Sequence, residues 1–230
     1  MNEKLLMSQE EQRQVNWSYL IPLVATLTFG VSNVGFVIAG NNQVGGILAS
    51  KLDWDDRQAA RWNSTISSAG VLGLIIGSFA VELILRKIGR RKAIILTSLV
   101  VILAVIPTIF LSVWSIILGK FFFGLAAGSM IVASSIYMNE TVPAEHSSTF
   151  GFSINFGVIC GIMVCLLMGA ALPDPKEDLE SAKDNTFWIF INLFPIVISS
   201  ISIMLWLCCF KLESVKACLT AASVQEGATS

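Results

Sequence analysis

Long uncharged, apolar stretches alternate with short charged segments along the whole chain. Each stretch can hold an apolar helix of about 20 residues, the length that crosses the hydrocarbon of a bilayer. The pattern therefore predicts an all-α membrane protein with six transmembrane helices. We place these helices at 18–46, 63–86, 93–111, 114–138, 149–171 and 186–210.

The composition fits this assignment and excludes several other classes of protein. Hydrophobic residues make up 54% of the 230 positions and charged residues only 13%, whereas about a quarter of a soluble domain is charged. The net charge of -1 argues against nucleic-acid binding. His146 is the only histidine, and the apolar segments carry neither paired carboxylates nor metal-ligand spacing. We expect no enzyme activity, metal or cofactor.

The segment from Arg86 to Lys92 sets the orientation, because it holds five positive charges in seven positions. The positive-inside rule places such a short loop in the cytoplasm. Alternation then places 1–17, the loop 139–148 and the tail 211–230 in the cytoplasm, and the loops 47–62 and 172–185 outside or in a lumen. Plasma and vacuolar membranes stay open alternatives, and we expect the tail to be truncated. We interpret the glycosylation pattern Asn63-Ser64-Thr65 as a coincidence, because it lies at a helix start.

Three motifs follow one another in order on this six-helix frame. They are Gly89-Arg90-Arg91-Lys92, the run Lys120-x-x-x-Gly124-x-x-x-Gly128, and Tyr137-x-x-Glu140-x-x-Pro143-Ala144. Together they resemble the N-terminal six-helix half of the sugar porter family in the major facilitator superfamily. The resemblance implies two inverted three-helix repeats and transport of a hexose-like solute by alternating access.

Amides within apolar helices are the candidate solute contacts, because each carries a donor and an acceptor for a hydroxyl-rich solute. Asn155 occupies the position at which the resemblance implies a sugar-contacting amide, and Asn33 and Gln43 join it from the first helix, beside Asn41 and Asn42. Bonding between helices is the alternative explanation for Asn155. We predict that Asn33, Gln43 and Asn155 bind the solute.

Charged residues at the predicted cytoplasmic helix ends are the candidate gate, since the resemblance implies that such charges latch two halves together. They are Glu82, Arg86, Arg90, Arg91, Glu140 and Glu213. Arg86 and Lys87 replace an Asp-Arg pair of the family, and Glu82 is placed to pair with Arg86 at i,i+4. Ser147 replaces the arginine that would neutralise Glu140. We therefore expect Glu140 to lack a cationic partner and the gate to be weakened or rewired.

Lys120, Gly124 and Gly128 share one helical face, where glycines allow a neighbouring helix to approach closely. Close packing is the plainer explanation, and sliding of helices during a transport cycle is the alternative. Lys120 lies near the outer end of its helix. We therefore expect its side chain to reach the lipid headgroups.

The first helix has no aspartate that could carry a proton, which favours facilitated transport over proton coupling. One six-helix half has no enclosed pathway, so the expected partners, besides solute and membrane lipid, are a missing C-terminal half or a second copy. A half-size protein that binds a partner or senses solute without transport is an alternative function. An organic-ion transporter of the same superfamily is another.

Overall fold

The computed structural model describes residues 17–142, 147–173, 180 and 184–227. This part of the chain is helical, without a β-strand. Its elements are α2 (Trp17–Lys51), α3 (Asp56–Ile88), α4 (Arg90–Val105), the 3₁₀ helix η1 (Ile106–Ile109), α5 (Val113–Thr141), α6 (Ser147–Gly169) and α8 (Phe187–Gly227). Six of the described spans are long and apolar enough to cross a membrane, which confirms the predicted helix count.

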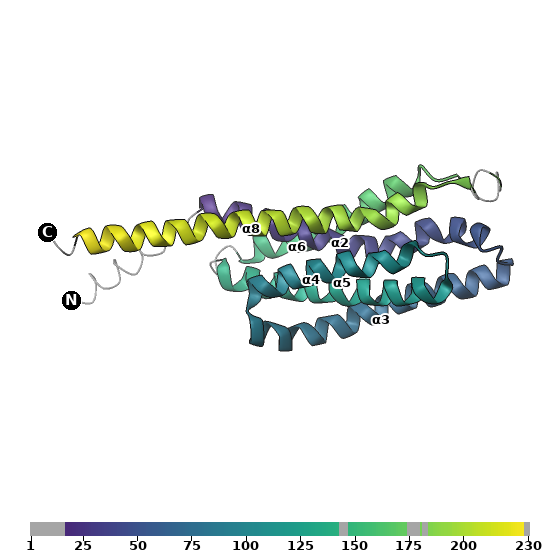
Figure 1. Cartoon of the computed structure of the whole chain (residues 1–230), viewed down its shortest axis with the longest axis horizontal. Coiled ribbons are helices and arrows are strands. Elements are labelled where there is room, and N and C mark those ends of the chain that lie inside the picture. Colours follow the sequence, from purple (N-terminus) through teal and green to yellow (C-terminus); the bar gives the residue numbers. More distant parts are fainter. Residues whose placement is uncertain (1–16, 143–146, 174–179, 181–183, 228–230) are drawn as a thin grey trace.

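The helices pack side by side along one axis in Figure 1, with the start of α2 and the end of α8 at the same end of the bundle. We call this the inner end; it also holds the turn at Gly89. The opposite end, with the turn between Lys51 and Asp56, is the outer end. Successive helices thus run in opposite directions between the two ends, as the predicted topology requires.

Helix boundaries differ from the predicted ones where polar residues continue a helix. The first two helices leave only a short turn at 52–55, and Gln58 Oε1 accepts the backbone N–H of Asp55 at the start of α3. The third helix gives way to 3₁₀ geometry around Pro107, because proline has no N–H for the α-helical bond. Gly89 separates α3 from α4 with a φ of 82°, a conformation that glycine adopts without strain.

The predicted inverted repeats are visible in which helices pack together. The first three helices, α2, α3 and α4, correspond to α5, α6 and α8. The contact of α2 with α6 matches that of α5 with α3, and the contact of α2 with α8 matches that of α5 with α4. Each packing in one repeat therefore has its counterpart in the other.

Glycines lie where α5 packs on α3 and where α6 packs on α2, and they confirm the close-packing explanation. A Cβ at Gly124 or Gly128 would fall on a backbone carbonyl of α3, and one at Gly73 or Gly77 would fall on a carbonyl of α5. Gly161 of α6 meets the backbone of α2 in the same way. Glycines on facing helices bring backbones into direct contact, so they hold each pair at short range.

Candidate solute path and gate

Asn155 is the candidate solute residue that faces outward from the bundle. It lies eight residues into α6, about 12 Å along the helix axis at 1.5 Å per residue. Its side chain is exposed and makes no hydrogen bond with the described part of the chain. An unsatisfied amide at this depth is costly against lipid. This face of α6 is therefore suited to water, solute or another polar surface.

Two exposed phenylalanines flank this amide. Phe152 and Phe156 are 65% and 53% exposed, and they lie three residues before Asn155 and one after it. A ring beside an amide offers an apolar surface and a hydrogen-bonding group together. Sugars present the same combination, because their C–H faces are apolar and their hydroxyls donate and accept.

Asn33 has the contacts of a link between helices. It is 1% exposed, and its Nδ2 donates to Ser199 Oγ of α8 at 3.1 Å and to the Gly30 carbonyl at 3.3 Å. Its Oδ1 is buried without a partner. The bond to α8 satisfies the donor, so Asn33 joins the two helices in this conformation.

Gln43 is half-buried at the outer end of α2, where it packs against Gly169 of α6. A Cβ at Gly169 would strike the Gln43 amide. The three predicted solute residues thus face three environments, namely α8, the end of α6 and the open face of α6. The described contacts do not join them into one site.

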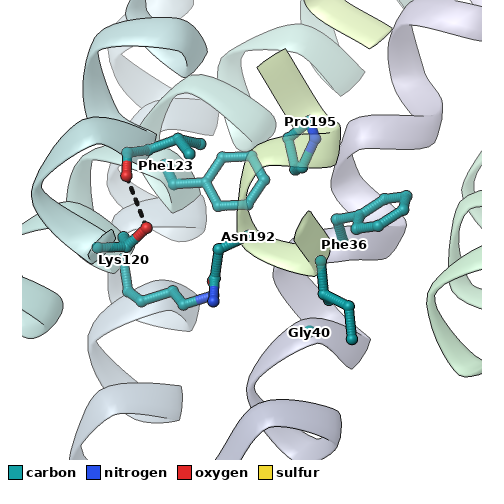
Figure 2. Close-up of a pocket in the computed structure, with 9 residues that line it drawn as sticks. Phe36, Gly40, Lys120, Phe123, Asn192 and Pro195 are labelled. Atoms are coloured by element: carbon teal, nitrogen blue, oxygen red, sulfur yellow. Dashed lines mark hydrogen bonds between the residues drawn. The ribbon is translucent and has the colours of Figure 1, made fainter. Parts of the chain in front are cut away.

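The prediction that Lys120 reaches the headgroups is wrong. The residue is 7% exposed, and its Nζ donates to Asn192 Oδ1 of α8 at 3.2 Å. Figure 2 shows the side chain directed to Asn192, among Phe36, Gly40 and Phe123. The Lys120 ammonium also lies 6.0 Å from the centroid of the Phe123 ring, within reach of a cation–π contact.

Burial of Lys120 follows from the position of its helix. α5 packs against α3, α4 and α2 along its length, so a side chain on its glycine face has no path to the lipid. Asn192 Nδ2 donates to the Trp188 carbonyl at 3.1 Å, which turns its oxygen toward Lys120. No acidic side chain of the described residues lines this pocket. The sequence feature that could have predicted this buried partner for Lys120 is Asn192, an isolated amide in the apolar part of α8.

Among the described residues, two ion pairs lie at the inner end. Glu82 and Arg86 form the expected i,i+4 pair on α3, with 2.7 Å between Oε1 and Nη2, and both side chains are largely exposed. The expectation that Glu140 lacks a cationic partner is wrong, because Arg90 at the start of α4 pairs with it. The sharp turn at Gly89 brings Arg90 to the end of α5. Arg90, which follows the turn at Gly89, thus takes the place of the arginine that the family resemblance implies at position 147.

Arg91, a predicted gate residue, builds a second link at the inner end through Tyr137 of the third motif and through Trp206, which the sequence did not single out. Its Nε donates to the Tyr137 hydroxyl at 2.8 Å, and its guanidinium carbon lies 5.9 Å from the centroid of that ring. Tyr137 in turn meets the buried Trp206 of α8 edge to face, with 5.6 Å between centroids. This network ties α4, α5 and α8 together. Glu213 lies on α8, outside the side chains that the structure describes.

The profile of the family described as "Sugar (and other) transporter" matches residues 20–216. The chain belongs to this family. It is therefore an integral, multi-pass membrane protein of a transporter family. The match covers all six spans, and it confirms the family that the three motifs indicated.

Individual relatives match shorter stretches. Inositol transporter 4 of Arabidopsis thaliana is 33% identical over 103 residues, which cover 44% of this chain and 18% of the relative. The mouse facilitated glucose transporter member 3 of solute carrier family 2 is 31% identical over 124 residues, which cover 52% of this chain and 25% of the relative. The matched regions thus span a quarter or less of these relatives.

Solved structures show the same fold. The proton:xylose symporter XylE, bound to 6-bromo-6-deoxy-D-glucose, superposes with a TM-score of 0.69 at 16% identity, over 84% of this chain and 45% of that one. An inward-open XylE from E. coli gives 0.68 at 14% identity, over 82% and 48%. The chain thus matches about half of a major facilitator.

Proposed function

We propose that this protein moves a hexose-like, uncharged solute across the membrane by alternating access, through facilitated diffusion. Asn155 carries the proposal, because an exposed, unpaired amide inside a membrane span is stable only beside water, solute or a polar partner. A second six-helix half would close the pathway over this face of α6, and it would be either a C-terminal half or a second copy. The named substrates of the relatives, glucose, xylose and inositol, support the solute class.

Facilitated rather than proton-coupled transport is supported by the buried polar residues. In the described part of the chain these are Asn, Ser, Thr and one Lys, without a carboxylate. A proton carrier of the usual kind is an acidic group inside the span. Gating is assigned to the charges of the inner end, of which Arg90 and Glu140 join different helices.

The test is uptake of labelled D-glucose by vesicles reconstituted with the protein purified from its native membrane, so that any second half comes with it. We expect saturable uptake that an inward proton gradient does not increase. Asn155→Leu lowers this uptake by about tenfold, the effect of ~1.4 kcal/mol of lost hydrogen bonding. Ser153→Ala is the control, because the Ser153 hydroxyl bonds only the Phe150 carbonyl of its own helix.

Results of the uptake assay that differ from this expectation point to other functions. Glucose uptake no faster than in empty vesicles supports the half-size protein that binds or senses without transport. Uptake driven by the proton gradient contradicts facilitated diffusion. The intact mass of the purified protein, against 24.9 kDa for this chain, separates a longer polypeptide from an assembly of two copies.

Lys120 favours a second candidate, transport of an organic anion. Its ammonium is buried without an acidic partner among the described residues that line its pocket, so it leaves a positive potential inside the bundle. Comparing uptake of D-glucuronate with that of D-glucose separates the two candidates. In an anion transporter, glucuronate is preferred and Lys120→Met removes that preference. In a sugar transporter, glucose is preferred in both forms.

A further inference from the structure

A cleft of about 480 Å³ opens between α2 and α3 at the outer end of the bundle, and we call it the outer cleft. Every residue that lines it is an amide, a hydroxyl or a glycine. These residues are Asn41, Asn42, Gly45, Gly46, Asn63, Ser64, Ser67 and Ser68. The lining therefore has neither a formal charge nor an apolar side chain.

The outer cleft is lined by two helices that are both long and apolar enough to cross a membrane. Ser68 is seven residues past Arg61, the last charged residue of α3 before the apolar stretch, which is about 10 Å along the helix. Asn42, Ser64 and Ser68 are nevertheless exposed. Exposed amides and hydroxyls at this depth would be unsatisfied against hydrocarbon, so the cleft is suited to an aqueous opening rather than to lipid.

Hydrogen bonds across the cleft hold its lining in place. Asn41 Nδ2 donates to Ser67 Oγ at 2.7 Å and to the Asn63 carbonyl at 3.1 Å. Asn63 Nδ2 donates to the Gly45 carbonyl at 3.2 Å. A Cβ at Gly45 would lie 3.0 Å from the Asn63 side chain, so the glycine makes room for this bond. α2 and α3 thus present a fixed set of polar groups.

This arrangement leaves an acceptor without a donor. The Oδ1 of Asn63 is buried and makes no hydrogen bond, although its Nδ2 is engaged. A buried acceptor without a donor is destabilising, because it has given up its hydrogen bonds to water. The Asn42 amide, on the open side of the cleft, is unpaired among the described residues. A molecule with hydroxyl groups in the cleft can reach the exposed Asn42 amide, donating to its oxygen and accepting from its nitrogen.

We propose that the outer cleft is a recognition site for a neutral, hydroxyl-rich solute, a sugar or polyol, at the outer mouth of the protein. Its volume is within the range of about 300–1,000 Å³ that small-molecule sites occupy. An ion would find no opposite charge there to replace its hydration. The proposal shares its solute class with the proposed function and adds a second, outer site to the face around Asn155.

The experiment measures occupancy of the cleft by the rate of thiol labelling. Ser64→Cys and Thr65→Cys are made separately in the full chain, purified from the native membrane and reconstituted. A membrane-impermeant thiol reagent is then added with and without D-glucose. The two positions are adjacent and both exposed, but only Ser64 lines the cleft, while the Thr65 hydroxyl bonds the Arg61 carbonyl. The unsubstituted protein corrects for its own five cysteines.

We expect saturating glucose to slow labelling of Ser64→Cys by at least about tenfold, as mass action requires of an occupied site, and to leave Thr65→Cys unchanged. D-glucuronate should protect less, because its charge has no partner in the lining. Asn42→Leu should raise the half-protecting glucose concentration by about fivefold, the equivalent of ~1 kcal/mol. Since Asn42 is exposed, this variant tests the site without disturbing the core.

Three results would overturn the proposal. The first is that glucose protects Ser64→Cys and Thr65→Cys equally. The second is that glucuronate protects Ser64→Cys as well as glucose does. The third is slow labelling of Ser64→Cys without any sugar, which would mean that another protein surface fills the cleft. Labelling reports occupancy and uptake reports flux. Protection without uptake would therefore contradict only the transport function, and uptake without protection only the outer site.

Discussion

The two ends of the bundle are polar in different ways. At the inner end, arginines and glutamates pair across helices, with Arg90 on Glu140 and Arg91 on the Tyr137 hydroxyl. At the outer end, the cleft between α2 and α3 is lined by uncharged amides and hydroxyls. Charged pairs can be exchanged for other pairs when surfaces separate, whereas neutral groups discriminate by hydrogen-bond geometry. This difference supports the proposed latch at the inner end and the proposed solute site at the outer end.

The packing of α3 against α5 joins the two ends. Disrupting it should have the largest effect on stability. α3 and α5 run the length of the bundle and touch through Gly124 and Gly77. Gly124→Leu would place a side chain on the α3 backbone and should destabilise the protein by about 3 kcal/mol or more. Gly151→Ala is the control, because nothing lies within 4 Å of a Cβ there. Unfolding in denaturing detergent measures both, and equal stability of the two variants would contradict the direct contact.

Charge reversal at the inner end should have the next largest effect. Glu140→Lys places a second cation beside Arg90, and we expect uptake to fall by about tenfold with little loss of stability, since exposed pairs contribute about 1 kcal/mol or less. The double variant Glu140→Lys with Arg90→Glu should restore uptake. Glu82→Lys, which disturbs a pair within one helix, should change uptake less. No rescue by the double variant would mean that the pair is not part of a latch.

Removing one hydroxyl should have a smaller effect and test the link to α8. Tyr137→Phe removes the acceptor for Arg91 Nε but keeps the ring against Trp206. We expect a loss of about 1 kcal/mol in the free energy of unfolding, the usual value of one hydrogen bond. Thermal unfolding of the reconstituted protein measures it. A change as large as that of Tyr137→Ala would mean that the hydroxyl, not the ring, holds the network.

Added salt should affect the charged inner end and leave the neutral outer cleft unchanged, and we expect this effect to be the smallest of the four. Raising the ionic strength from 0.1 to 1 M shortens the screening length from about 10 to 3 Å. The difference in uptake between Glu140→Lys and the parent should shrink, since both Arg90 and Glu140 are about half exposed. Protection of Ser64→Cys by glucose should stay constant. If salt abolished that protection, the outer cleft would not be a neutral site.

The sequence predicted the elements that depend on local chemistry. Charge-free stretches located six helices, and the basic turn at Gly89 located the inner end, because hydrophobicity and backbone freedom are properties of the segment itself. The spacing of Gly124 and Gly128 predicted a close crossing for the same reason. The pairing of Glu82 with Arg86 could be predicted because residues four apart lie on the same face of a helix.

The errors concern contacts between segments that are distant along the chain. The sequence places Lys120 near the end of its helix, which led to the wrong prediction that it reaches the headgroups. It does not show which helices pack around that position. Glu140 was expected to be unpaired, because its partner Arg90 lies 50 residues away. Asn33 and Asn155 have the same side chain, yet one is buried against Ser199 and the other faces outward. The rotation of each helix in the bundle decides such roles.

The length of α8 has a mechanical consequence. The helix runs unbroken from Phe187 to Gly227, 41 residues, and extends past the rest of the bundle at the inner end in Figure 1. From Cys208 to Gly227 it projects about 28 Å at 1.5 Å per residue. Because Asn192 and Trp206 contact α5 along the part of α8 that lies within the bundle, a tilt of about 10° would move the far end by roughly 5 Å. A small change in the direction of this helix within the bundle therefore becomes a larger displacement at its far end.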